Sequence, residues 1–254
     1  MARRSGEVDP AIWKPLFALA TMEWFDGDVA AAIAASEAAR ARDENEYVLA
    51  NLGSFYLCDG AFEQAREAWE TARDLAPQSY VGDEFLGMAH YFLGDFDESA
   101  RLRQAAIDKV ATGAPEIHEM WGNLGDAYRQ AGNEAAAIDA YLRAAEIAER
   151  DHLRGNAPVA DRAARAYYYT MLEQLAPSQV PESVSRGIAD QLDDIEASLQ
   201  TATAHRRMAQ IRLARGEPAA ARRALDRAAA TCRGYARMPD FAELRVVAGN
   251  RDAT

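Results

Sequence analysis

Small residues recur at fixed intervals along this chain, and their spacing is the feature that most restricts its fold. Five small residues are each followed by glycine seven positions later, in the pairs Ala20/Gly27, Gly53/Gly60, Gly87/Gly94, Gly125/Gly132 and Ala209/Gly216. Counting on from each glycine, the fifth position is again small and the twelfth is alanine. The pattern predicts repeated hairpins of two helices. The later glycine would close the first helix with a positive φ, and the alanines would line one face of the second.

Gly53 shows why a small residue is expected inside a helix. Glycine in a helix interior costs about 1 kcal/mol relative to alanine, so a compensating contact is needed. Close approach of the two helices of the hairpin would provide it, and a larger side chain would overpack the contact at a cost of about 1–3 kcal/mol. One hairpin is too small to bury its own apolar residues, so successive hairpins should stack into a continuous core.

Two stretches, residues 46–79 and 118–151, share a more detailed pattern. The first carries Leu49, Leu52, Gly53, Tyr56, Gly60, Ala65, Trp69, Ala72 and Pro77, and the second carries Trp121, Leu124, Gly125, Tyr128, Gly132, Ala137, Tyr141 and Ala144. This spacing resembles the tetratricopeptide repeat, a helix–turn–helix unit of about 34 residues. The resemblance implies an all-α fold, a right-handed α-solenoid of about six repeats in which the first helix of each unit lines a concave groove.

The predicted organisation is a series of units closed by a capping helix. A lead-in over residues 1–12 precedes four repeats at 13–45, 46–79, 80–117 and 118–151, a degenerate fifth repeat at 152–201, a sixth repeat at 202–235, and a capping helix with tail at 236–254. In the fifth unit a proline-containing turn replaces the glycine turn, and Ile188, Leu192, Ile195 and Leu199 are expected to form one apolar stripe. The run Tyr167–Tyr169 turns about 100° per residue on a helix, so at least one tyrosine should be exposed or in the groove, unless the fifth repeat is distorted there.

The charge of the chain argues against nucleic-acid binding. The net charge is −12, so a nucleic acid would need a concentrated basic face. The arginines that could form one are Arg206, Arg207, Arg212, Arg215, Arg222 and Arg223. They are interpreted as a solvated face that pairs with acidic neighbours.

The number of cysteines and the length of apolar stretches predict the cellular compartment of the protein. Cys58 and Cys232 fit no metal or redox spacing and cannot form a disulfide framework, so a reducing cytoplasm is expected. No stretch approaches the ~18 apolar residues of a membrane span, and the N-terminal residues do not form a signal peptide. The many alanines and arginines suggest the GC-rich genome of a bacterium.

No catalytic constellation is found in the sequence. The four histidines are scattered, and the glycines are accounted for by turns and helix contacts rather than by a phosphate-binding loop. No nucleophile motif is present. The sequence therefore predicts no enzyme activity, no catalytic residue, no metal site and no cofactor.

The groove positions implied by the family resemblance supply the candidate site. They give an apolar wall that ends in two charged residues, formed by Trp24, Phe25, Leu57, Met88, Tyr91, Phe92, Asp126 and Arg129. Such a groove suits a peptide or helix with hydrophobic anchors. The Lys and Asn pattern with which family members bind the tails of heat-shock chaperones is missing, because Ala50, Ser54 and Glu84 occupy those places.

The predicted function is a protein-interaction scaffold with a protein or peptide partner of unknown identity. Neither nucleic acid nor membrane is expected as a partner, and a homo-oligomer is possible. The chain's own N-terminus or a symmetry-related copy are the other occupants of the apolar wall. The alternative is a regulatory or sensory tail of a larger bacterial kinase, cyclase or transcription regulator, which the final "GYARMPDFAELR" resembles.

Overall fold

A computed structural model describes residues 13–110, 116–155 and 157–250. Within these ranges the chain forms helices and no strand. The predicted lead-in at 1–12 and the last four residues of the predicted tail lie outside the described residues.

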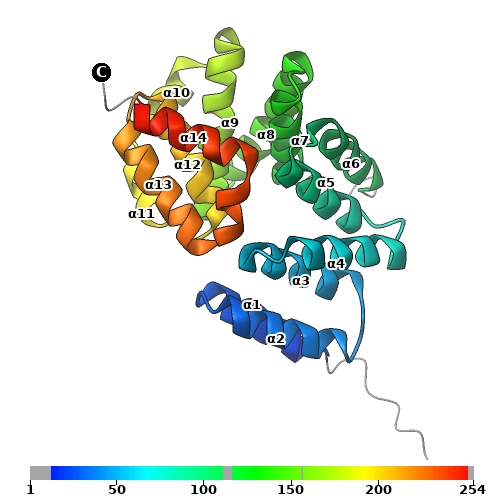
Figure 1. The fold of residues 1–254 in the computed structure, drawn as a ribbon. Coiled ribbons are helices and arrows are strands. Elements are labelled where there is room, and N and C mark those ends of the chain that lie inside the picture. The colour runs from blue at the N-terminus through cyan, green and yellow to red at the C-terminus, as the bar shows by residue number, and fades with distance from the viewer. Residues whose placement is uncertain (1–12, 111–115, 156, 251–254) are drawn as a thin grey trace, which may run out of the picture.

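Four helix hairpins form the first part of the molecule (Figure 1). They are α1 (Trp13–Phe25) with α2 (Val29–Arg40), α3 (Glu46–Asp59) with α4 (Phe62–Leu75), α5 (Val81–Leu93) with α6 (Phe96–Lys109), and α7 (His118–Gln130) with α8 (Glu134–Leu153). The second helix of each hairpin also packs against the first helix of the next. This stacking is the α-solenoid that the repeated spacing predicts, whereas the exact limits of the units stay a prediction.

The fifth unit is irregular. Helix α9 (Val159–Leu175) is followed by the 3-10 turn η2 (Pro177–Gln179) and two short helices, α10 (Glu182–Ala189) and α11 (Leu192–Ala197). The single apolar stripe expected here is therefore divided between two helices, although Ile188, Leu192 and Ile195 are all buried. The chain ends with α12 (Ala202–Ala214), α13 (Pro218–Thr231), the 3-10 segment η3 (Arg233–Arg237) and α14 (Pro239–Asn250), which is the predicted capping helix.

The recurring turn glycines have the predicted backbone conformation. All five lie in the left-handed region, with φ of 86° at Gly27, 83° at Gly60, 79° at Gly94, 78° at Gly132 and 75° at Gly216. At Gly60 the backbone N–H donates to the carbonyl of Leu57 at 3.0 Å and so ends α3. Because a side chain is strained in this conformation, glycine is needed wherever a hairpin turns in this way.

Gly53 permits the close approach that its position within α3 predicts. An ideal Cβ at this residue would lie 2.2 Å from Nε1 of Trp69 on α4. The indole is almost completely buried and donates to the carbonyl of Ala50 at 3.0 Å, so it has no room to retreat. Gly125 is similarly placed against Tyr141, with 2.8 Å between the ideal Cβ and the ring. The same hairpin contact is therefore built twice from glycine and an aromatic ring.

The stack curves until its C-terminal helices return to its N-terminal half. Figure 1 shows the orange and red helices turned back toward α3 and α5. Helix α12 packs on α9, and η3 packs on α3. In the described part of the chain, no helix combines the length and apolar character needed to cross a membrane.

Replacing Gly53 by alanine is expected to lower the free energy of unfolding by about 1–3 kcal/mol, because the added methyl group collides with the Trp69 ring. Gly187 on α10 is the matched control, since a Cβ there meets nothing within 4 Å. Gly187→Ala should be neutral or slightly stabilising. Urea denaturation of both variants checks this, and wild-type stability of Gly53→Ala would contradict the assigned contact.

Candidate binding surfaces on the concave face

The chain's own C-terminal segments cover much of the predicted groove wall. Tyr91 on α5 is 3% exposed, and its hydroxyl donates to Oδ2 of Asp240 on α14 at 3.0 Å. The ring of the buried Phe92 meets Tyr235 of η3 edge-on, with 5.4 Å between centroids. Leu57 is also buried. Its carbonyl faces Gly234 so closely that a Cβ there would lie 2.1 Å from the oxygen.

Asp126, the polar end of the predicted groove, is a buried centre of the closed face. Its Oδ1 accepts hydrogen bonds from the hydroxyls of Tyr141 at 2.7 Å and Tyr167 at 2.6 Å. Its Oδ2 pairs with Nη2 of Arg206 on α12 at 2.8 Å. The same guanidinium reaches Asp240 through Nη1 at 2.5 Å. One arginine thus joins α7 to α14 across the middle of the solenoid.

The charges around Asp126 favour its ionised form. Burial raises the pKa of this carboxyl, but Arg206, Arg207 and Arg129, with the Tyr167 hydrogen bond, together lower it from 3.8 to about 2. Arg129, the last of the predicted groove residues, is half-buried. Burial lowers its pKa, whereas Tyr167, Tyr141 and Asp126 raise it by more, so it stays charged.

The interpretation of the arginines as one solvated face is wrong for three of them. Arg206, Arg207 and Arg212 are each less than a tenth exposed. Arg212 pairs with Glu196 at 2.6 Å and with Glu217 at 2.7 Å. The reason is the position of α12, which lies between α9, α13 and α14 and has hardly any solvent-facing side.

The tyrosine run shows the same effect of surrounding helices. Tyr167 and Tyr168 are completely buried, and Tyr169 is half-buried, with its ring 5.4 Å from the guanidinium carbon of Arg165. Helices pack on more than one side of α9 and bury successive tyrosines. The expectation assumed that only one face of this helix is buried.

Cys58 and Cys232 form a disulfide, which the sequence analysis did not predict. The bond joins the end of α3 to the residue before η3, 174 positions later, where the two Cα atoms are 4.5 Å apart. Beside it, Arg233 pairs with the carboxylate of Asp59 and donates from Nε to its carbonyl at 2.9 Å. No sequence spacing could reveal this pair, because only the curvature of the whole array brings the two cysteines together.

Among the described residues, two hollows lie where the N-terminal and C-terminal parts meet. The outer one, called the cleft below, measures about 470 Å³ and is bounded by Trp24 and Phe25 on one side and by Thr231 and Arg233 on the other. The inner one, called the cavity below, measures about 330 Å³ and is lined by residues of α5, α6, α7, α9, α12 and η3. Thr201 contributes to both, so the two hollows adjoin.

Six of the predicted groove residues line one or the other of these two hollows. Phe25 is 65% exposed at the cleft, where Trp24 stacks on Phe55 with 4.9 Å between centroids. Met88, Tyr91, Phe92 and Asp126 line the cavity instead. The apolar wall is therefore accessible at its N-terminal end and enclosed further along.

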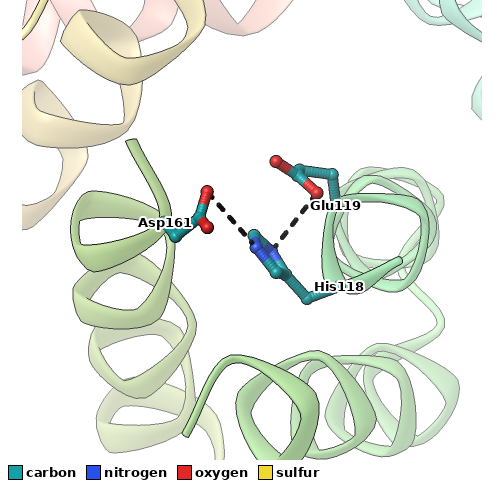
Figure 2. Close-up of side chains that lie close together, drawn as sticks. All are labelled: His118, Glu119 and Asp161. Atoms are coloured by element: carbon teal, nitrogen blue, oxygen red, sulfur yellow. Dashed lines mark ion pairs between the residues drawn. The ribbon is translucent and has the colours of Figure 1, made fainter. Parts of the chain in front are cut away.

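At the rim of the cavity, a histidine lies between two carboxylates (Figure 2). Nδ1 of His118 is 3.6 Å from Glu119, and its Nε2 is 3.7 Å from Asp161 on α9. Nδ1 also lies 3.1 Å from the hydroxyl of Tyr168. Each of the three residues offers one ligand atom, and these atoms all lie within 4.8 Å of one another, so the group could hold a metal ion. The three residues connect α7 to α9, and burial, with Glu119 and Asp151, raises the pKa of Asp161 against the opposing effect of His118.

Comparison with known proteins agrees with the repeated hairpins. Residues 86–152 match the model of the tetratricopeptide repeat family. Residues 86–152 are therefore tetratricopeptide repeats. Over 111 residues it is 27% identical to human tetratricopeptide repeat protein 7B, a match that covers 44% of this chain and only 13% of that relative.

Several solved structures share the fold of this chain. The apo form of RapI has a TM-score of 0.61 at 8% identity, covering 99% of this chain and 87% of that chain. PilF of Pseudomonas aeruginosa has a TM-score of 0.55 at 14% identity, covering 92% of this chain and 97% of that chain. At such identities the likeness concerns the fold alone.

Asp126→Asn is expected to destabilise the protein at neutral pH by about 2 kcal/mol, which corresponds to the lowering of the Asp126 pKa. A carboxyl with a lowered pKa stabilises the folded state above its unfolded value of 3.8, and the effect disappears as pH falls to about 2. The stability difference from wild type should therefore shrink across this interval in denaturation curves. Exposed Asp139→Asn is the control, and a pH-independent difference for Asp126→Asn would contradict the assignment.

Replacing both cysteines by serine should lower the free energy of unfolding by about 2–5 kcal/mol, because the bond closes a very long loop. Dithiothreitol should destabilise the wild type to a similar extent and leave the double variant unchanged. Two thiols that react with Ellman's reagent in the unreduced, denatured wild type would show that the bond does not form.

Proposed function

We propose that this protein is an interaction scaffold that binds an extended segment of a partner protein in the cleft beside α1. The tetratricopeptide repeat fold in general serves protein–protein interaction. The observation that carries the specific proposal is the exposure of Phe25 at the cleft. A large aromatic side chain in a concave, partly apolar site is the typical anchor point of a peptide interface.

The walls of the cleft suit a mainly apolar segment with a few polar contacts. Trp24, Phe25 and Val29 supply apolar surface, and Gln200 and Thr231 supply hydrogen-bonding groups on the opposite side. Two further side chains of α1, Leu19 at 42% and Met22 at 63% exposure, extend the apolar surface beyond the cleft. The first unit therefore offers the apolar contacts that the buried part of the predicted groove does not.

This proposal retains only part of the groove first predicted. Leu57, Tyr91, Phe92 and Asp126 contact the C-terminal segments, so a partner would reach them only by displacing η3 and α14. Binding in the cleft needs no such opening. The preformed walls would also limit the ordering cost of association.

The cellular location forms part of this proposal. Disulfides persist mainly in oxidising compartments, so the Cys58–Cys232 bond favours such a compartment over the reducing cytoplasm inferred from cysteine number. A bacterial source, a homo-oligomer and a role as the regulatory part of a larger protein stay predictions.

A phage-displayed random peptide library tests the proposal with the full chain as bait. Enriched peptides should carry an apolar or aromatic anchor. Fluorescence polarisation should show that Phe25→Ala weakens their binding at least about tenfold, since a truncated hot-spot residue typically costs more than 1 kcal/mol. Leu75 is 51% exposed and lines neither hollow, so Leu75→Ala is the matched control. Enriched peptides that bind Phe25→Ala and wild type equally would place the site elsewhere.

A further inference from the structure

The cavity contains a buried arginine whose charge is not matched by an ion pair. Arg207 on α12 is 4% exposed and lines the cavity. Among the described residues its one hydrogen bond runs from Nη2 to Oδ1 of Asn123 at 2.9 Å, and no carboxylate lies within ion-pair distance. Its Nε is buried without a hydrogen-bond partner. A buried charge left unpaired in this way is costly.

The neighbouring charges are already paired with one another. Arg103 binds Glu84 at 2.6 Å, and Arg206 binds Asp126 and Asp240. Glu84 also accepts from Asn123 at 3.0 Å, so Asn123 links the Arg103 pair to Arg207 without supplying a charge. Among the described residues, Arg207 is therefore the arginine of the cavity wall that has no direct carboxylate partner.

Aromatic rings hold the Arg207 guanidinium in place. It lies 5.1 Å from the ring centroid of Tyr167 and 5.4 Å from that of Tyr168, both completely buried. Burial lowers the pKa of Arg207, but Tyr168, Asp126 and Tyr167 raise it by more, so the group remains cationic. A fixed, planar cation in a partly apolar cavity is well suited to recognise a carboxylate.

The other side chains that line the cavity indicate which chemical groups a bound anion would have besides its charged group. Met88, Phe92, Tyr235 and Met238 give the cavity an apolar side, and Glu119 also contributes to its lining. The volume of about 330 Å³ lies at the lower end of the range for small-molecule sites. This volume admits one small molecule and not a length of polypeptide.

We propose that the cavity binds a small organic carboxylate with an apolar or aromatic body, whose charge pairs with Arg207. The proposal is independent of the peptide cleft, because the two hollows share only Thr201. The carboxylate would give Arg207 the direct ion-pair partner that the neutral Asn123 does not supply. The apolar body would contact the methionines and aromatic rings opposite.

Isothermal titration calorimetry with phenylacetate and its neutral analogue phenylacetamide tests the proposal on the full, oxidised chain. Wild type should bind phenylacetate in a saturable manner and bind phenylacetamide at least tenfold more weakly. Arg207→Met should reduce the affinity for phenylacetate at least tenfold. Exposed Arg223→Met and the cleft variant Phe25→Ala should bind it like wild type.

A second readout keeps the test valid if Arg207→Met is unstable, which circular dichroism would reveal. In wild type, the Arg207 Nε–Hε resonance should shift on titration with phenylacetate and not with phenylacetamide. Absence of saturable binding to wild type, equal binding of the acid and the amide, or wild-type affinity in a folded Arg207→Met variant would each overturn the proposal.

Discussion

The closed form of this solenoid depends on a single guanidinium placed between two carboxylates. Arg206 comes from the sixth unit, Asp126 from the fourth, and Asp240 from the capping helix. All three are almost completely buried, so loss of Arg206 would leave two carboxylates uncompensated in the interior, at a cost of about 3–5 kcal/mol. The hydroxyls of Tyr141 and Tyr167 also stabilise the buried Asp126 carboxylate, because they donate the hydrogen bonds that water would otherwise supply.

Closure changes what the concave face is able to do. In an open array the first helices of successive units would present a continuous groove. Here η3 and α14 lie in that groove, and the disulfide fixes η3 to α3 beside them. Over the described residues, closure consequently leaves the cleft and the cavity on the concave surface. The two hollows differ in chemistry, since Trp24 and Phe25 give the first an aromatic side among polar residues, whereas an arginine without an ion pair lines the second.

Local features of the fold could be predicted because they depend on neighbours in sequence. The turn glycines, the contact of Gly53 with Trp69 and the start of the last helix at Pro239 each involve residues within one hairpin or one turn. The irregular fifth unit was predicted less completely. Ile188, Leu192 and Ile195 are buried as expected, but Leu199 lies beyond α11 and is only partly buried, and the helix is interrupted between Ala189 and Leu192. Periodicity identifies a buried face and does not reveal such a break.

The amino-acid sequence by itself determined that this chain forms stacked helical hairpins, since small residues at fixed spacing allow only that close packing. Only the tertiary structure decided which surface stays accessible. Curvature accumulates over many units, and it alone brings Cys58 to Cys232, Tyr91 to Asp240 and Arg207 to Asn123. Contacts between residues more than eighty positions apart have no spacing rule, so neither the burial of the predicted groove nor the charge left inside it could be read from the chain.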